Sequence, residues 1–180
     1  AKLDEPEFGL RTEAVDTGEL LDDIALRFAE RAARQGVRMR SDTAAPGGGA
    51  APRAELDVEL FERAVANLVD NALKFCPAGS TVTLAAAARD GRVEVSVADD
   101  GPGIPAADLP QLFDRFYQSR PTVAPATAEG GRGLGLAIVK RIAELHGGDA
   151  AVESVLGGGT RVVLTLPAAS SSRRDELPIA

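Results

Sequence analysis

The sequence has little of several features that would define a function by themselves. Cys76 is its only cysteine, so an internal disulfide and a cysteine-based metal site are both excluded. No stretch approaches the roughly 18 to 20 apolar residues of a membrane-spanning helix, and no signal peptide is visible. The net charge of −7 and the sequence pI of about 4.8 argue against nucleic acid as the main partner.

The length and the lysine content of the chain further limit the folds and site residues that it can have. With 180 residues, 44% of them hydrophobic, the chain can bury one α/β core and little more. It begins at Ala1 without an initiator methionine, so we expect a fragment of a larger protein. Only three lysines occur, at positions 2, 74 and 140, which indicates that Lys74 is placed for a purpose.

The segment 67–75 (Asn-Leu-Val-Asp-Asn-Ala-Leu-Lys-Phe) combines polar and apolar residues at helical spacing. Asn67, Asn71 and Lys74 fall at i, i+4 and i+7, on one stripe of a helix. The apolar side comprises Phe61, Val65, Leu68, Ala72 and Phe75. An amide oxygen suits Mg²⁺ and a lysine suits phosphates, but a helix N-cap followed by a solvated polar stripe explains the segment equally well.

Asp99 stands at the end of an alternating segment, 93–98, that predicts a strand. A carboxylate at that position can accept a hydrogen bond from the amino group of a ligand. Gly101 and Gly103 allow the backbone to approach a planar ligand closely. An ordinary acidic turn remains the alternative, because Asp-Gly and Pro-Gly pairs occur in turns of every kind.

The segment 130–139 (Gly-Gly-Arg-Gly-Leu-Gly-Leu-Ala-Ile-Val) opens a predicted helix with glycines. Free N–H groups and the positive end of the helix dipole would face any anion there. Many glycine-rich helix starts are simply loop exits. The three segments together, each suited to one part of a nucleotide and in a fixed order, indicate a nucleotide-binding site.

With these segments the chain resembles the catalytic, ATP-binding domain of sensor histidine kinases, within the gyrase, Hsp90, histidine kinase and MutL superfamily. Residues 67–75 resemble the N box, 99–103 the DxGxG (G1) box, 112–117 the F box, 131–135 the GxGxG (G2) box, and 157–166 the closing turn and strand. The match runs from about Leu10 to Pro167. It implies a two-layer α/β sandwich of the Bergerat (GHKL) type, whose mixed, mostly antiparallel sheet is covered by helices on one face.

The resemblance also implies roles for individual residues. Asp99 would accept the adenine amino group with Thr160 nearby, and Asn71 would ligate Mg²⁺ with Asn67 beside the metal or its waters. Lys74 and the G2-box N–H groups would offset phosphate charge, so the catalytic residues are Asn67, Asn71 and Lys74. The nucleotide-binding residues are Asn67, Asn71, Lys74, Phe75, Asp99, Gly101, Gly103, Ile104, Arg115, Gly131, Arg132, Gly133, Leu134, Gly135, Leu136 and Thr160.

Asn67 distinguishes between relatives in this superfamily. Hydrolases and serine-directed kinases typically carry a glutamate there as general base, whereas an amide cannot take a proton. A neutral imidazole is already nucleophilic at pH 7 and needs no such base. Asn67 therefore favours histidine phosphorylation over ATP hydrolysis; Asp70 is the alternative base, but it lies off the polar stripe.

The segment 117–130 has two prolines and no periodic apolar pattern. Its place between the F and G2 boxes is that of the family's ATP lid. Arg115 and Arg120 at its front and Arg132 at its back could reach phosphates, although Arg132 departs from the family pattern. Phe113 and Phe116 are expected to anchor the lid or dock the helical domain.

His146, the only histidine, invites a reading as the phosphoacceptor. It stands at a predicted helix end, where the family also carries a histidine as part of the fold. The family's acceptor lies in a separate upstream helix, and no such motif occurs here. The substrate histidine is therefore expected to lie outside this chain.

The expected organisation is the end of a helical hairpin at 1–10, the catalytic domain at 11–168 and a disordered tail at 169–180. Within the domain we expect strands at 12–15, 37–40, 81–88, 92–98, 151–155 and 160–166, and helices at 18–34 and 133–146, with Asp57 capping the N-box helix. A turn at Asp90-Gly91 joins the central strands. Cys76 is expected to pack as a small hydrophobe.

The implied partners are an upstream histidine-bearing domain and a response regulator, not nucleic acid. The fragment is expected to be monomeric and cytoplasmic, and its parent a homodimer anchored in the bacterial cell membrane. Two other functions remain open. One is a nucleotide-binding module without transfer activity, and the other is an anti-sigma-type serine kinase.

Overall fold

A computed structural model describes residues 9–45, 47–103 and 131–169, with only the backbone described at 131–135 and 155. The elements follow in the order β1 (Glu13–Asp16), α1 (Thr17–Arg34), β2 (Arg38–Asp42), β3 (Arg53–Leu56), α2 (Val58–Phe75), β4 (Thr81–Arg89), β5 (Arg92–Asp99), α3 (Gly131–Leu145), β6 (Asp149–Val155) and β7 (Gly159–Pro167). The whole predicted lid (117–130) and residues 170–180 of the predicted tail (169–180) lie outside the described residues. Ala169, the first residue of the predicted tail, instead donates its N–H to the carbonyl oxygen of Arg53 at 2.9 Å.

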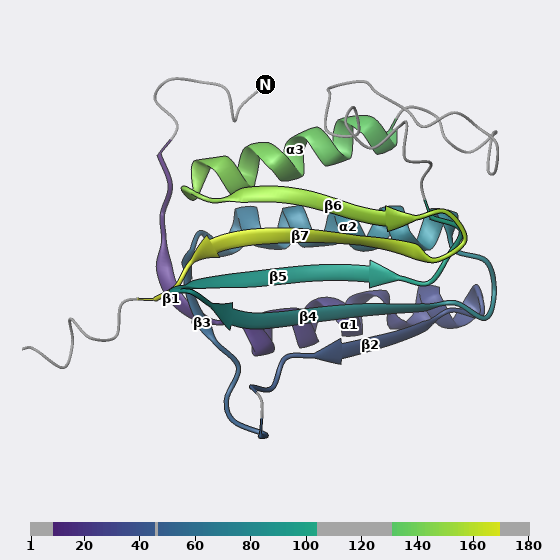
Figure 1. The fold of residues 1–180 in the computed structure, drawn as a ribbon, viewed down its shortest axis with the longest axis horizontal. Helices are drawn as coiled ribbons and strands as arrows, with labels where there is room; N and C mark the ends of the chain where they lie inside the picture. The colour runs from purple at the N-terminus through teal and green to yellow at the C-terminus, as the bar shows by residue number, and fades with distance from the viewer. Residues whose placement is uncertain (1–8, 46, 104–130, 170–180) are drawn as a thin grey trace, which may run out of the picture.

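A five-stranded sheet in the order β2-β4-β5-β7-β6 forms one layer. Strand β2 pairs with β4 in parallel, and the other three pairings are antiparallel. In Figure 1 helices α1 and α2 lie behind this sheet and α3 lies along its β6 edge, and β1 and β3 form a separate antiparallel pair at one end. The predicted two-layer α/β sandwich with a mixed sheet is confirmed.

The core lies between the helices and one face of the sheet. Alternate residues of β5 point to this face, so Val93, Val95 and Val97 are all buried. The largest fully buried side chains come from every layer: Phe61, Leu21, Ile24, Leu56, Leu73, Leu84, Ile142, Leu164, Leu166, Val65 and Val69. The same alternation continues one step beyond Val97 and brings Asp99 to the helix-covered face at the end of its strand.

Capping and turn residues explain where α1 and α2 begin and where the chain turns between β4 and β5. Asp57 accepts a hydrogen bond from the N–H of Leu60 and caps α2, as predicted. The turn between β4 and β5 has positive φ at Asp90 (51°) and Gly91 (77°), which matches the predicted hairpin. Helix α1 starts at Thr17, one residue before its predicted start, because Asp16 caps it.

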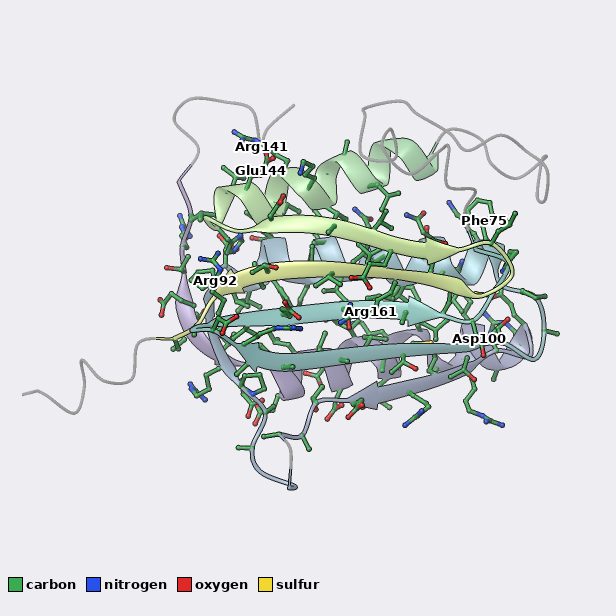
Figure 2. The ribbon with its side chains drawn as sticks, in the orientation of Figure 1. Phe75, Arg92, Asp100, Arg141, Glu144 and Arg161 are labelled. Atoms are coloured by element: carbon green, nitrogen blue, oxygen red, sulfur yellow. The ribbon has the colours of Figure 1, made fainter. Side chains whose placement is uncertain are left out.

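Several helices and strands begin or end together at one end of the molecule. The carboxyl ends of β5 and β6, the start of β7, the end of α2 and the beginning of α3 all lie on the right in Figure 1. Figure 2 places the labelled side chains of Phe75 and Asp100 at this same end. Within the described residues, none of the helices is both long and apolar enough to cross a bilayer.

Candidate functional site

Helix α2 carries the three polar residues singled out in the sequence, but they sit in different environments. Asn71 is only 8% exposed, whereas Asn67 is half-buried and Lys74 is exposed. The Nδ2 atom of Asn71 is fully buried and has no hydrogen-bond partner among the described residues. A buried amide group left unsatisfied costs roughly 1–3 kcal/mol. Such a group is expected where a ligand completes the site.

Lys74 contacts Asp70, which the sequence had placed off the polar stripe. Lys74 Nζ lies 3.3 Å from Asp70 Oδ2, and Arg31 Nη1 of α1 lies 2.7 Å from Asp70 Oδ1. One carboxylate therefore holds two cations, and it ties α1 to α2. Because both of its oxygens are engaged, Asp70 is poorly placed to act as a general base. The Arg31 contact was not predicted, since it joins residues 39 positions apart.

The end of β5 is held in a defined conformation by hydrogen bonds from backbone N–H groups of the turn after it and of β4. Asp99 Oδ1 accepts a hydrogen bond of 2.9 Å from the N–H of Gly101, and Asp100 Oδ1 accepts one of 2.8 Å from the N–H of Thr81. A side chain at Gly101 would begin 3.1 Å from Asp99 Oδ1 and 3.2 Å from Cys76 Sγ, so the glycine leaves room for both groups. Gly103 has a φ of 80°, a conformation that favours glycine.

Cys76 lies against Asp99 rather than merely filling the core. It caps the C-terminus of α2 and is partly buried. Burial, followed by the charge of Asp99 and a hydrogen bond to its carboxylate, raises the pKa of the thiol from 9.0 to about 12. The expectation of a small hydrophobe was therefore incomplete, because this thiol joins the end of α2 to the end of β5. No pattern in the sequence reveals this contact.

Three polar residues form a row across adjacent strands at the same end. Asp99 of β5 pairs with Thr160 of β7, and Thr160 pairs in turn with Ser154 of β6. Directly paired residues share one face of a sheet, and here it is the helix-covered face. Ser154 Oγ donates to the carbonyl oxygen of Gly159 at 2.8 Å and lies 3.0 Å from Thr160 Oγ1. Thr160 was predicted to lie beside Asp99, whereas Ser154 was not singled out.

Gly159 makes the close approach of β7 to β5 possible. It has a φ of 98°, and a Cβ there would collide with the carbonyl oxygen of Asp99. Thus a residue without a side chain precedes Thr160 and lets the polar row form.

The remaining predicted ligand-binding residues lie at or beyond the edge of the described structure. Ile104, Arg115 and Arg120 lie outside the described residues, as do Phe113 and Phe116. The backbone of Gly131, Arg132, Gly133, Leu134 and Gly135 forms the start of α3. The first N–H groups of an α-helix lack partners within the helix, so this end suits an anion. Leu136 is buried in the core at 3% exposure.

His146 is an integral part of the fold. It is 7% exposed, its Nε2 accepts a hydrogen bond from the N–H of Asp57, and its Nδ1 lies 2.8 Å from the carbonyl oxygen of Ile142. The second contact requires Nδ1–H to donate, which leaves Nε2 as the acceptor. Both ring nitrogens are therefore engaged. The imidazole joins the end of α3 to the start of α2 and has no nitrogen left to attack a phosphate.

Comparison with known proteins shows which family this chain belongs to. Residues 56–170 match the family model described as histidine kinase-, DNA gyrase B- and HSP90-like ATPase. The chain belongs to this family. The resemblance inferred from the sequence boxes is thereby confirmed, and the match includes α2, the polar row and α3.

Individual relatives are histidine kinases. Histidine protein kinase DivJ of Caulobacter vibrioides is 44% identical over 146 residues, which are 78% of this chain and 24% of DivJ. The crystal structure of full-length ShkA in complex with AMPPNP is 32% identical, with a TM-score of 0.79 over 94% of this chain and 34% of that one. The mycobacterial sensor histidine kinase MprB is 31% identical, with a TM-score of 0.70 over 88% of this chain and 98% of the solved one.

Proposed function

We propose that this chain is the ATP-binding catalytic domain of a sensor histidine kinase. It would transfer the γ-phosphoryl group of ATP to a histidine in an upstream dimerisation domain, for onward transfer to an aspartate of a response regulator. The family match and the relatives named as histidine kinases support this proposal. The chain spans only 24% of the length of DivJ, so the activity of the whole protein is part of this proposal.

The observation that carries the proposal is the unpartnered Nδ2 donor of Asn71, on the helix that leads to Asp99, because a phosphate oxygen would satisfy it. Cys76 at the end of α2 contacts Asp99, and Asn71 lies five residues earlier on the same helix. Five residues correspond to about 7.5 Å along a helix axis. A nucleotide lying along α2 could therefore place its adenine at Asp99 and Thr160 and its phosphates beside Asn71 and Asn67.

The donor groups present fit Mg²⁺ in complex with a nucleotide. Among the described residues no cluster of three or more histidine, cysteine, aspartate or glutamate side chains is arranged to hold a metal ion. A divalent ion here would therefore rest on phosphate oxygens and on a neutral amide oxygen, which Oδ1 of Asn71 would supply. The unpartnered Nδ2 of Asn71 can only donate and would suit a phosphate oxygen. When bound, Mg²⁺ would neutralise phosphate charge. Asn71 would hold it, with Asn67 beside its waters.

The side chains around this site favour a histidine acceptor over water or serine. Asn67 cannot take a proton, and the oxygens of Asp70 are engaged by Arg31 and Lys74. A neutral imidazole needs no general base. Lys74 would exchange its exposed contact with Asp70 for a phosphate, since a surface ion pair of this kind contributes only about 0–1 kcal/mol.

The alternative functions predict different behaviour. A module that only binds nucleotide would bind ATP but leave an added histidine domain unlabelled. An anti-sigma-type serine kinase would label serine, which gives an acid-stable phosphate ester. The amide at position 67 and the engaged carboxylate at position 70 leave a serine kinase without a general base, whereas the module that only binds nucleotide is distinguished by the transfer experiment.

The test is phosphorylation in trans. The chain is mixed with the upstream histidine domain of its parent protein and γ-labelled Mg·ATP. We expect acid-labile, base-stable label on that domain, and no label on this chain. Asn71→Ala should abolish the transfer, whereas Arg63→Ala, on an exposed position of the same helix, should retain it. Acid-stable label, or label on His146 of this chain, would contradict the proposal.

The proposed function also leads us to expect a particular oligomeric state, location and partner for the whole protein. We expect a homodimeric parent anchored in the bacterial cell membrane, with this domain at 11–168 on the cytoplasmic side and a helical hairpin before it. A response regulator would be its downstream partner.

A further inference from the structure

Lys74 lies between two groups of helix α2 that could hold its ammonium. At 3.6 residues per turn, it stands about 40° around the helix from Asp70 and about 60° from Asn71. Its Nζ contacts Asp70 Oδ2 at 3.3 Å, while the Nδ2 of Asn71 is buried and has no partner among the described residues. The flexible four-carbon side chain lets the ammonium reach either neighbour. Lys74 therefore has one position on a carboxylate and a second position, on the Asn71 side, where phosphates are expected.

Asp70 is shared between Lys74 and a second cation from another helix. Arg31 Nη1 of α1 lies 2.7 Å from Asp70 Oδ1, a shorter contact than the 3.3 Å of Lys74. The guanidinium offsets part of the carboxylate charge and repels the ammonium, so Asp70 holds Lys74 less firmly than an unshared carboxylate would. The three side chains are 33% to 40% exposed, so solvent screens these contacts and Lys74 can leave Asp70 at small cost.

We propose that Asp70 is an internal counter-ion of Lys74, which nucleotide phosphates must displace, and that Arg31 sets how firmly Asp70 holds the lysine. This inference rests on the proposed function, because it assumes that phosphates lie beside Asn71 and Lys74. Asp70 and Arg31 touch no ligand in this scheme. They are positioning residues, and their effect on nucleotide affinity passes through Lys74.

The proposal predicts opposite effects for the two positioning residues. Asp70→Asn removes the carboxylate charge but keeps an oxygen for Arg31, so Lys74 is released and Mg·ATP should bind roughly two- to fivefold more tightly. Arg31→Gln leaves Asp70 to Lys74 alone among the described residues, so Mg·ATP should bind more weakly by a similar factor. If Arg31 and Asp70 only joined α1 to α2, both variants would bind Mg·ATP more weakly or both would bind it unchanged.

Lys74→Met separates this route from a direct effect of charge. Removing a carboxylate or a guanidinium changes the electrostatic potential at the phosphates through space, whether or not Lys74 is present. In the Lys74→Met chain, Asp70 has no lysine to hold. The effects of Asp70→Asn and Arg31→Gln that pass through Lys74 should therefore disappear in that chain, whereas direct effects would persist.

The experiment measures the Kd of Mg·ATP for the 180-residue chain by calorimetric titration at fixed ionic strength. Asp70→Asn and Arg31→Gln are each made in the wild-type chain and in the Lys74→Met chain. Glu62→Gln is the matched control, because it breaks a 3.0 Å ion pair with Arg27 that also joins α1 to α2. Glu62 lies eight residues, or about 12 Å along the helix axis, before Asp70, so this control should leave the Kd unchanged.

Opposite shifts in the two variants, both of which vanish in the Lys74→Met chain, would confirm the proposal. Unchanged binding in either variant, weaker binding in Asp70→Asn, or shifts of the same size without Lys74 would overturn it. Urea unfolding shows whether each variant is folded, and should one of the two fail to fold, the other decides alone. Adenosine has no phosphate, so its Kd should be the same in every variant. If the wild-type chain binds neither Mg·ATP nor adenosine, the proposed function itself fails.

Discussion

Asn71→Ala should stabilise the ligand-free domain while it abolishes nucleotide binding. The side chain is 8% exposed and its Nδ2 has no partner among the described residues, so its removal returns roughly 1–3 kcal/mol. Helix propensity adds about 0.6 kcal/mol, and the small void subtracts about 1 kcal/mol. The net gain is about 0.5–2.5 kcal/mol in the free energy of unfolding. Such a gain shifts Tm by about 2–4 °C per kcal/mol.

Urea unfolding with and without Mg·ADP measures both halves of this prediction. At a ligand concentration of 100 times its Kd, the wild-type chain should gain about 2.7 kcal/mol, and the variant should gain nothing. Leu73→Ala, at a 1%-exposed position of the same helix, is the matched control and should cost about 2–5 kcal/mol. A loss of stability in Asn71→Ala comparable to that control would show that the amide has a structural partner, and the reasoning would be refuted.

Three further perturbations test separate contacts. Because the pKa of Cys76 is raised to about 12, first by burial, its alkylation at pH 8 should be about a thousandfold slower than that of the urea-unfolded chain; equal rates would contradict the raised pKa. Gly159→Ala should cost more than about 2 kcal/mol in chemical unfolding, because its Cβ meets the backbone of β5, whereas Gly157→Ala, also at positive φ but in open space, should cost about 1 kcal/mol. The hydrogen bond from Lys140 lowers the pKa of Asp149 and raises that of Lys140, so Asp149→Asn should cost at most about 0.5 kcal/mol at pH 7 for this exposed pair. That cost should vanish as the pH falls through the lowered pKa of Asp149, or rises through the raised pKa of Lys140; a cost independent of pH would exclude the ion pair as its source.

Features encoded locally were predictable from the sequence. The cap at Asp57 and the hairpin turn at Asp90 follow from the chemistry of one or a few consecutive residues. The alternation in β5 determined that Asp99 would stand at a strand end, and helical spacing placed Asn67 and Asn71 on one stripe. The strand end at Asp99 and the stripe of Asn67 and Asn71 are the features from which the nucleotide site was proposed.

Features that depend on distant parts of the chain were not predictable. Strand β3 was missed because Arg53–Leu56 is only four residues long and pairs with β1, about 40 positions earlier. The contact between Cys76 and Asp99 arises only when α2 packs against β5. The Ser154–Thr160 hydrogen bond likewise depends on the register of β6 against β7. Each of these contacts is set by tertiary packing, which outweighs local propensity.

The ion pair between Lys74 and Asp70 was predictable from the sequence only in part. Their i, i+4 spacing was visible in the sequence and is typical of an ion pair on a helix. The third member, Arg31, comes from α1 and could not be assigned from spacing. For this reason Lys74 was predicted to face phosphates, while in the structure it contacts a carboxylate.

The central claim is that Asp99 and the end of α2 form one nucleotide site, and calorimetric titration with Mg·ATP tests it most directly. The wild-type chain should bind one equivalent. Asp99→Asn should retain the fold but bind at least about tenfold more weakly, because a charge-assisted hydrogen bond contributes roughly 1.5–3 kcal/mol. Equal affinity in the two proteins, or no binding by the wild-type chain, would contradict the account.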